Sequence, residues 1–455
     1  MQRVAIASVL VMRPDVMILD EPTSQLDPEG SDEVFRAVET LTGSGITILM
    51  IEQKIEKLAA YCDRILLLHK GKQIAFDTPQ KVFSMPDLND YGIQAPAFTR
   101  ICKAEQVTLA DGTYPVTVKE AAEVLREKRA SGVYEHAMRK QVCKKQWERV
   151  RQAPDRYRQR TLKQAQGPGS LGLAGRLKTL LLWISSSGLK TGFLLSGRYS
   201  GLEDLNMKLD QRPTAIIGQN GAGKTTLVKL LKGLLKPVSG SIYFHGEDIS
   251  GKTVAMLAGS VGYVFQNPDD QIFKYNVMDE VLFGPLNIGM DPEQAKKEAA
   301  WALELTGLSG KEKENPYDLE LYERKMTAIA SVLAMDTDVL ILDEPTIAQD
   351  WKGRQIIGSI IRSLSGRGKL VIAILHDMDF VAENFERVII MAHGQVLADG
   401  TAKEVFAQEE VLKKARLQKP YVMQLSEALG YEKSYLTVEE LLKDRMSFVC
   451  CKLSF

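Results

Sequence analysis

This sequence has no net charge and few cysteines, and it lacks a long apolar run. Its 58 lysines and arginines balance 58 aspartates and glutamates, so the chain as a whole shows no basic bias toward nucleic acid. The five cysteines have no metal-ligand spacing and are expected to be reduced thiols. No basic region precedes an apolar run at the N-terminus, so no signal peptide is expected.

The longest apolar stretch, residues 171–195, is interrupted by Arg176, Lys178 and Lys190. We therefore expect no membrane-spanning helix and only a peripheral role at a membrane. With 455 residues and ordinary apolar and charged fractions, the chain is long enough for two or three domains with full cores.

A long-period repeat is the most informative feature of the sequence. The string Leu-Asp-Glu-Pro-Thr occurs at residues 19–23 and again at 342–346, so that Asp20 falls on Asp343 and Glu21 on Glu344. The same offset persists over roughly 80 positions, which indicates two duplicated units.

Both copies are expected to form an α/β fold. Short continuous apolar runs separated by helical patterns predict buried parallel strands with crossover helices. These runs are residues 16–20, 46–51 and 64–68 in the first copy and residues 339–343, 370–375 and 387–391 in the second. The second copy also predicts a strand at 214–218, a helix from about Lys224, and a helix over 293–305 capped by Asp291.

A phosphate-binding loop occurs once. Gly218-Gln-Asn-Gly-Ala-Gly-Lys-Thr-Thr226 satisfies the pattern G-x-x-x-x-G-K-[ST], follows an apolar strand and opens a helix. Glycines let backbone N–H groups turn toward phosphate oxygens, while the lysine reaches the β- and γ-phosphates and the first threonine ligates Mg²⁺. The nucleotide-binding candidates are Asn220, Gly221, Ala222, Gly223, Lys224, Thr225 and Thr226.

Three further side chains are candidates for the chemistry. Asp343, at a strand end, is placed to hold Mg²⁺, and Glu344 directly after it is placed to polarise an attacking water. His376 follows another strand, where ligands of α/β sheets bind, and is a candidate to contact the γ-phosphate. The alternatives are that the acidic pair is a solvated loop end and that the histidine is structural.

These residues, in this order, resemble the ATP-binding-cassette (ABC) ATPases. The resemblance makes Lys224 the Walker A lysine, Asp343 the Walker B aspartate, Glu344 the catalytic base and His376 the switch histidine. It also makes Gln266 the Q-loop glutamine, which ligates Mg²⁺ and senses the membrane partner. The segments 261–273 and 283–287 are similar to those of energy-coupling-factor importers, which take up vitamins and metal ions.

In this family ATP lies between two cassettes, each supplying a P-loop to one site and a signature sequence to the other. The second copy's signature position reads Leu319-Glu-Leu-Tyr-Glu323, where Glu320 repels a phosphate and bulky residues block backbone approach. Gln53 stands at the first copy's switch position, and residues 24–27 stand at its D-loop.

The first copy therefore lacks parts of a nucleotide site. Residues 1–7 align just after the signature, so its own P-loop is expected before Met1. We expect one site for ATP and Mg²⁺, on the second copy, with poor hydrolysis because the signature that would cap it is missing.

The resemblance implies a P-loop NTPase of the ABC type with two cassettes in tandem, the first incomplete. The expected parts are a partial first cassette (1–84), its small C-terminal subdomain (85–126), a linker (127–198), a complete second cassette (199–406) and a second small subdomain (407–455). Ten lysines and arginines within residues 139–163 predict either attraction to anionic lipid or to a transporter's cytoplasmic loops, or a solvated linker helix. Tyr199 is a candidate to stack on adenine.

The predicted function is an ATPase subunit that energises a membrane importer from the cytoplasmic face of the cell membrane. Its expected partners are transmembrane subunits contacted near Gln266 and a second ATPase cassette, with no nucleic acid. One alternative is a soluble ABC ATPase acting on ribosomes or DNA, and another is an inactive remnant of a tandem ATPase.

Overall fold

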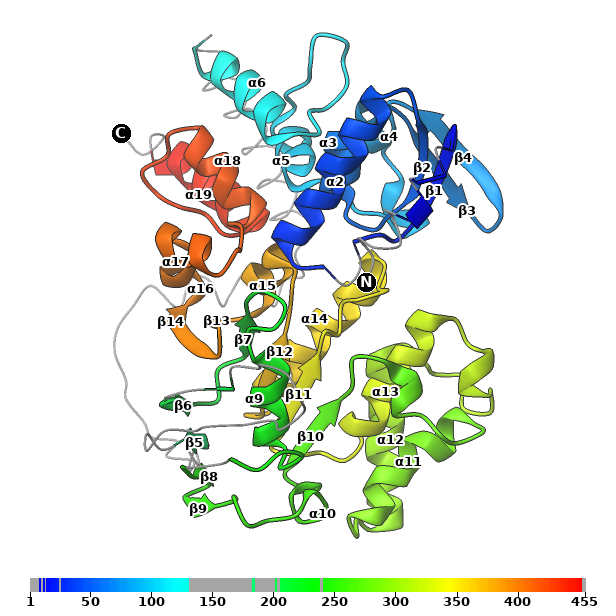
Figure 1. The fold of residues 1–455 in the computed structure, drawn as a ribbon, viewed down its shortest axis with the longest axis vertical. Coiled ribbons are helices and arrows are strands. Elements are labelled where there is room, and N and C mark those ends of the chain that lie inside the picture. The colour runs from blue at the N-terminus through cyan, green and yellow to red at the C-terminus, as the bar shows by residue number, and fades with distance from the viewer. Residues whose placement is uncertain are drawn as a thin grey trace, which may run out of the picture.

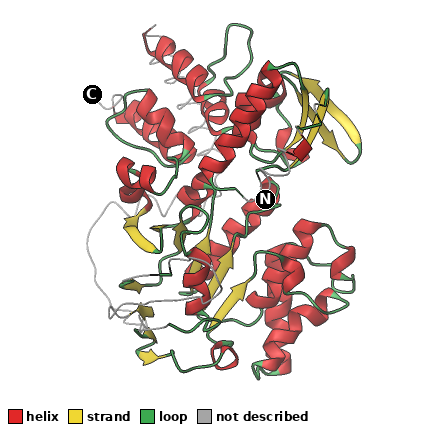
Figure 2. Cartoon of the chain, viewed as in Figure 1, coloured by secondary structure: helices red, strands yellow, loops and turns green. Residues whose placement is uncertain are grey.

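A computed structural model describes residues 8–9, 11–12, 14–23, 26–130, 182–184, 201–202, 205–237 and 240–451. The basic stretch at 139–163, Tyr199, and the residues aligned just after the signature (1–7) lie outside these ranges. Helices and strands alternate through both copies, as the apolar runs predict, and Figure 2 shows the mixed α/β character of the chain. No helix in the described ranges is long and apolar enough to cross a membrane.

A six-stranded sheet forms the centre of the second copy. Its strand order is β10-β11-β12-β7-β13-β14, with every neighbouring pair parallel except the last. Its strands are β7 (Thr214–Ile217), β10 (Val261–Val264), β11 (Val339–Asp343), β12 (Leu370–Ile374), β13 (Arg387–Ala392) and β14 (Gln395–Thr401). Every residue of β7, β10, β11, β12 and β13 is buried, because two hydrophobic clusters cover the two faces. The carboxyl ends of the parallel strands therefore meet at one edge.

Helices pack on this sheet and also form a separate helical group, seen at the lower right of Figure 1. They are α9 (Lys224–Leu231), α11 (Val277–Asn287), α12 (Pro292–Thr306), α13 (Leu321–Leu333), α14 (Trp351–Gly366) and α15 (Met378–Asn384). The Asp291 side chain accepts from the Glu293 and Gln294 amides, which confirms the predicted cap of α12.

Smaller elements complete the second copy. A four-stranded antiparallel sheet contains β5 (Leu182–Ile184), β6 (Met207–Leu209), β8 (Ile242–Phe244) and β9 (Glu247–Asp248), next to α10 (Val254–Leu257). Short 3₁₀ turns lie at Pro268–Asp270 and Pro316–Asp318.

The first copy repeats only part of this architecture. Its elements are β1 (Val16–Asp20), β2 (Thr47–Ile51), β3 (Ile65–His69), β4 (Lys72–Asp77), α2 (Pro28–Gly43), α3 (Ile55–Tyr61), α4 (Pro79–Ser84) and a 3₁₀ turn at Leu88–Tyr91. The strands form two separate pairs, β1–β2 parallel and β3–β4 antiparallel.

The prediction that the first copy's strands are buried on both faces is wrong. Val16 and Ile18 of β1 are 58% and 66% exposed, and Leu49 and Ile51 of β2 are 50% and 54% exposed. In the second copy, β7 joins β12 to β13, and helices cover both faces. Among the described residues, no strand joins β2 to β3 in this way. One face of the β1–β2 pair therefore stays exposed to solvent.

The small C-terminal units of the two copies pack against each other, as Figure 1 shows at the upper left. The first unit contains α5 (Ala97–Glu105) and α6 (Val118–Ala130). The second contains α18 (Tyr421–Ala428) and α19 (Val438–Cys451), after α16 (Ala402–Phe406) and α17 (Glu409–Lys414). Their common hydrophobic cluster includes Phe98, Ile101, Leu125, Leu425 and Leu441, all nearly inaccessible to solvent. This contact holds the copies together at the end remote from β10.

Candidate nucleotide site

The loop between β7 and α9 has the backbone that a phosphate cradle requires. Gly218 and Gly223 have φ angles of 151° and 98°, which side-chain-bearing residues rarely adopt. A Cβ at Gly218 would lie 2.1 Å from the Met391 carbonyl oxygen, and a Cβ at Gly223 would lie 2.4 Å from Leu202 Cδ2. Only glycine fits at either position, and α9 begins at Lys224, as predicted.

Lys224 is buried beneath this loop. Its Nζ donates to the carbonyl oxygens of Gly218 (2.7 Å) and Gln219 (3.0 Å), and only 5% of the residue is exposed. Burial lowers the pKa of Lys224 to about 8, against the opposing charges of Glu344, Asp27 and Asp343. An added anion would favour the charged ammonium here.

Asp343 ends β11 with one carboxylate oxygen satisfied and the other free. Tyr263 donates its hydroxyl to Oδ2 at 2.7 Å, while Oδ1 is buried without a partner. Burial raises the pKa of Asp343. An unpaired buried carboxylate oxygen is costly, and a cation such as Mg²⁺, which prefers oxygen ligands, would satisfy it.

Glu344 is held from three sides. Gln266 Nε2 donates to its Oε2 at 2.9 Å, and His376 Nε2 lies 3.0 Å from its Oε1. Lys325 donates to the backbone carbonyl of Glu344 at 2.6 Å, and the Glu344 backbone has a left-handed φ of 49°. Burial acts to raise the pKa of Glu344, but the His376 hydrogen bond and the charges of His376 and Lys224 hold it below the usual value. The carboxylate is therefore ionised and oriented.

The predicted residues of the second copy thus converge at one edge of the sheet: Lys224, Gln266, Asp343, Glu344 and His376. Thr225 and Thr226 follow Lys224 in the first turn of α9, with Thr225 exposed.

Sequence reasoning missed Tyr263 and Lys325. Lys325 is 2% exposed and also donates to the Gln266 carbonyl at 3.2 Å, so it joins the two loops on either side of the site. The sequence did offer one indication, because Lys325 directly precedes the mostly apolar residues 326–334, and the structure buries almost all of this helix.

The first copy reaches the phosphate loop through its D-loop position. Asp27 Oδ2 accepts from the backbone N–H of Asn220 at 3.2 Å, while its Oδ1 caps α2 through the Gly30 amide at 2.8 Å. Ser24 and Gln25 of the same stretch lie outside the described residues. The two copies therefore meet at the P-loop.

The two copies also meet where the second copy's signature position faces the first copy, and this interface carries acidic groups. Gln53 Nε2 donates to Glu21 Oε1 at 2.6 Å, the counterpart of the His376–Glu344 contact. A cavity of about 510 Å³ lies there, lined by Asp20, Glu21, Gln53, Glu320, Leu321, Tyr322 and Ala348. The residues at the signature position thus face the first copy's acidic pair. Three carboxylates around this cavity oppose a bound triphosphate.

Comparison with known proteins places the chain in a family. The ABC transporter family model matches residues 202–347. An ABC transporter ATP-binding protein of Methanosarcina acetivorans is 36% identical over 100% of this chain, which spans 71% of that relative. The chain belongs to the ABC transporter ATP-binding proteins.

Other members of the family are similar over shorter or comparable lengths. An ABC transporter ATP-binding protein of Caldanaerobacter subterraneus is 34% identical, covering 97% of this chain and 72% of that protein. One from Pyrococcus furiosus is 40% identical over 53% of this chain and 92% of that protein. Among solved structures, cbiO1 from Clostridium perfringens is 35% identical with a TM-score of 0.46, over 55% of this chain and 99% of that one. The family match shows that this ABC protein has the cassette ATPase fold, and members of the family hydrolyse ATP with Mg²⁺.

Proposed function

We propose that this ABC ATPase binds one Mg-ATP, on its second cassette (residues 199–406), and that its hydrolysis energises a membrane importer of the vitamin or metal-ion class. The observation that supports this proposal most directly is the ionised Glu344 carboxylate, fixed by Gln266 and His376 beside the buried Lys224. A general base needs both ionisation and fixed orientation, and Glu344 has both.

Each side chain has a proposed role. The backbone N–H groups of Asn220 through Thr226 and the ammonium of Lys224 bind the phosphates. Thr225, Gln266 and Asp343 hold Mg²⁺, which neutralises phosphate charge when bound. The free Oδ1 of Asp343 is the acceptor that this cation fits.

Glu344 orients the attacking water and takes its proton. His376 holds the Glu344 carboxylate in place and faces the position of the γ-phosphate. The transferred proton thus moves to a carboxylate that is already ionised in the free protein.

Substitution of the two equivalent glutamates tests this assignment. Glu344→Gln keeps the shape but removes the base, so we expect turnover to fall by a factor of about 100 or more while ATP binding persists. Glu21→Gln is the matched control from the first copy and should leave turnover within about twofold. Equal losses in both variants, or full turnover in Glu344→Gln, would contradict the proposed roles.

An exposed aromatic patch supports the proposed membrane partner. Phe273 and Tyr275, shortly after Gln266, are 52% and 84% exposed, and Phe283 is 38% exposed. The Phe273 and Phe283 rings pack edge to face at 4.6 Å between centroids, with Lys274 Nζ 4.5 Å from the Phe283 ring. Exposed aromatic clusters of this kind mark protein interfaces.

Co-purification tests the importer function. The chain should associate with a transmembrane subunit in detergent extracts, and Phe273→Ala with Tyr275→Ala should weaken that association. Met256→Ala, a change at another exposed apolar side chain, serves as the control. Retention of RNA or DNA without a membrane subunit would instead favour the ribosome- or DNA-acting alternative.

A further inference from the structure

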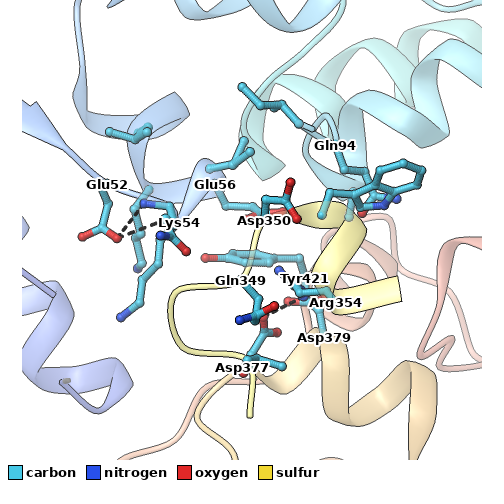
Figure 3. A pocket seen from close by; sticks show the side chains of 18 of the residues that line it. Glu52, Lys54, Glu56, Gln94, Gln349, Asp350, Arg354, Asp377, Asp379 and Tyr421 are labelled. Atoms are coloured by element: carbon cyan, nitrogen blue, oxygen red, sulfur yellow. Dashed lines mark hydrogen bonds and ion pairs between the residues drawn. The ribbon is translucent and has the colours of Figure 1, made fainter. Parts of the chain in front are cut away.

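A second large cavity lies between the two copies, next to the proposed nucleotide site, from which His376 also lines it. It has a volume of about 500 Å³ and is lined by α3 of the first copy, by α14 and α15 of the second, and by parts of both C-terminal units. Figure 3 shows its charged lining. We propose that this cavity binds a small amphipathic organic amine, with its ammonium group near Glu56 and Asp379.

Glu56 and Asp379 line this cavity outside any described ion pair, although the charge of Arg354 acts on both carboxyl groups. No ion pair within the described part of the chain involves either carboxylate, and the polar contact of Asp379 is the Tyr421 amide, at 2.9 Å. Burial raises the pKa of Glu56, and it raises that of Asp379 well above its usual value, with Asp377 and Glu56 adding to the effect. A bound cation would offset this cost.

The cations that line the cavity are already engaged. Arg354 pairs with Asp377 at 2.7 Å, and Arg100 lies 3.8 Å from Glu383. Lys54 donates to a backbone carbonyl and a serine hydroxyl of the first copy, at 3.0 and 2.9 Å. The lining contains seven carboxyl groups against five lysines and arginines, so it has a formal surplus of negative charge that would favour a bound cation.

Gln349 supplies an independent indication of a ligand. This residue lines the cavity and is only 3% exposed, yet both polar atoms of its amide lack a hydrogen-bond partner. Buried amides are almost always hydrogen-bonded, because each unsatisfied group costs free energy. A ligand with a polar group in this cavity would give the Gln349 amide a hydrogen-bond partner.

The rest of the lining favours an organic cation. Ile93, Ala95 and Met378 offer apolar surface to an alkyl chain, and the Tyr421 ring also lines the cavity. No cluster of three or more His, Cys, Asp or Glu side chains in the described ranges could hold a metal ion. The volume lies within the range of small-molecule sites.

Calorimetry on the full chain without nucleotide tests the proposal. The probe is hexylamine, and hexanol and hexanoate are the controls for the charge. We expect hexylamine to bind and to raise Tm. The two controls should bind at least about tenfold more weakly, because they lack the positive charge.

Two variants locate the binding. Glu56→Gln combined with Asp379→Asn should weaken hexylamine binding by about tenfold or more. The ligand-free variant should be at least as stable as the parent, since it no longer buries unpaired carboxylates. Glu410→Gln, at a carboxylate outside the cavity, is the matched control and should bind normally.

Lys224→Ala should also bind hexylamine normally, which separates this site from the nucleotide site. Equal binding of hexanol, undiminished binding by the double variant, or no binding at all would overturn the proposal.

Discussion

Lys325→Met tests whether a buried lysine positions the proposed base. Burial lowers the pKa of Lys325 from 10.5 to about 8. At about 1.4 kcal/mol for each pKa unit, this corresponds to about 3.5 kcal/mol against the charged form. Methionine removes this cost but leaves the Glu344 and Gln266 carbonyls without their donor, at about 2 kcal/mol each. The free energy of unfolding at pH 7 should therefore fall by less than about 1 kcal/mol.

Turnover should fall far more than stability. Without Lys325, the left-handed backbone of Glu344 loses its anchor, so we expect kcat to drop by roughly 10- to 100-fold, with ATP affinity nearly unchanged. Lys232→Met is the matched control. That lysine is also buried, has a pKa of about 8 and donates to a backbone carbonyl, that of Val261, but it does not contact Glu344. Steady-state ATPase assays and chemical denaturation measure the two effects.

The pH dependence of stability gives an independent check. The folded protein binds fewer protons than the unfolded chain between pH 8 and 10.5, because the folded-state pKa of Lys325 is depressed. The parent should therefore gain stability relative to Lys325→Met as the pH rises through this window. Unchanged kcat in Lys325→Met, or equal loss in Lys232→Met, would refute the positioning role.

Three further predictions concern the nucleotide site. Tyr263→Phe removes the hydroxyl that donates to Asp343, so the Mg²⁺ concentration for half-maximal nucleotide binding should rise by about tenfold; no change would contradict this role. ATP binding should take up about half a proton at pH 8, because the phosphates raise the pKa of Lys224 from its free-protein value of about 8. Calorimetry in buffers of different ionisation enthalpy measures this proton uptake, and a binding enthalpy that does not depend on the buffer would contradict the prediction. Asp27→Asn keeps the cap but removes a negative charge beside the Asn220 amide, so ATP should bind about two- to fivefold more tightly, and weaker binding would argue against the repulsion.

The strands and the phosphate loop of the second copy could be predicted because their signals are local. Each strand is a short apolar run, and the glycines and lysine of the P-loop stand in fixed spacing, so β7, β11 and α9 begin within a residue of the predicted positions. The convergence of Asp343, Glu344 and His376 followed from the meeting of parallel strand ends at one edge.

The contacts between copies could not be predicted, because a repeat shows that two units exist but not how they meet. The hydrophobic cluster that joins Phe98 and Leu125 to Leu425 depends on three-dimensional packing. The exposure of Val16 and Ile18 likewise depends on which elements cover their strand. An apolar run in the sequence does not show which elements those are.

The stoichiometry of nucleotide binding is the most direct test of a single nucleotide site on the second copy. Equilibrium dialysis of Mg²⁺ and a non-hydrolysable ATP analogue should give one bound nucleotide per chain, lost in Lys224→Ala and kept in the neighbouring control Lys229→Ala. Two nucleotides per chain, or binding that survives Lys224→Ala, would contradict a single site on the second copy.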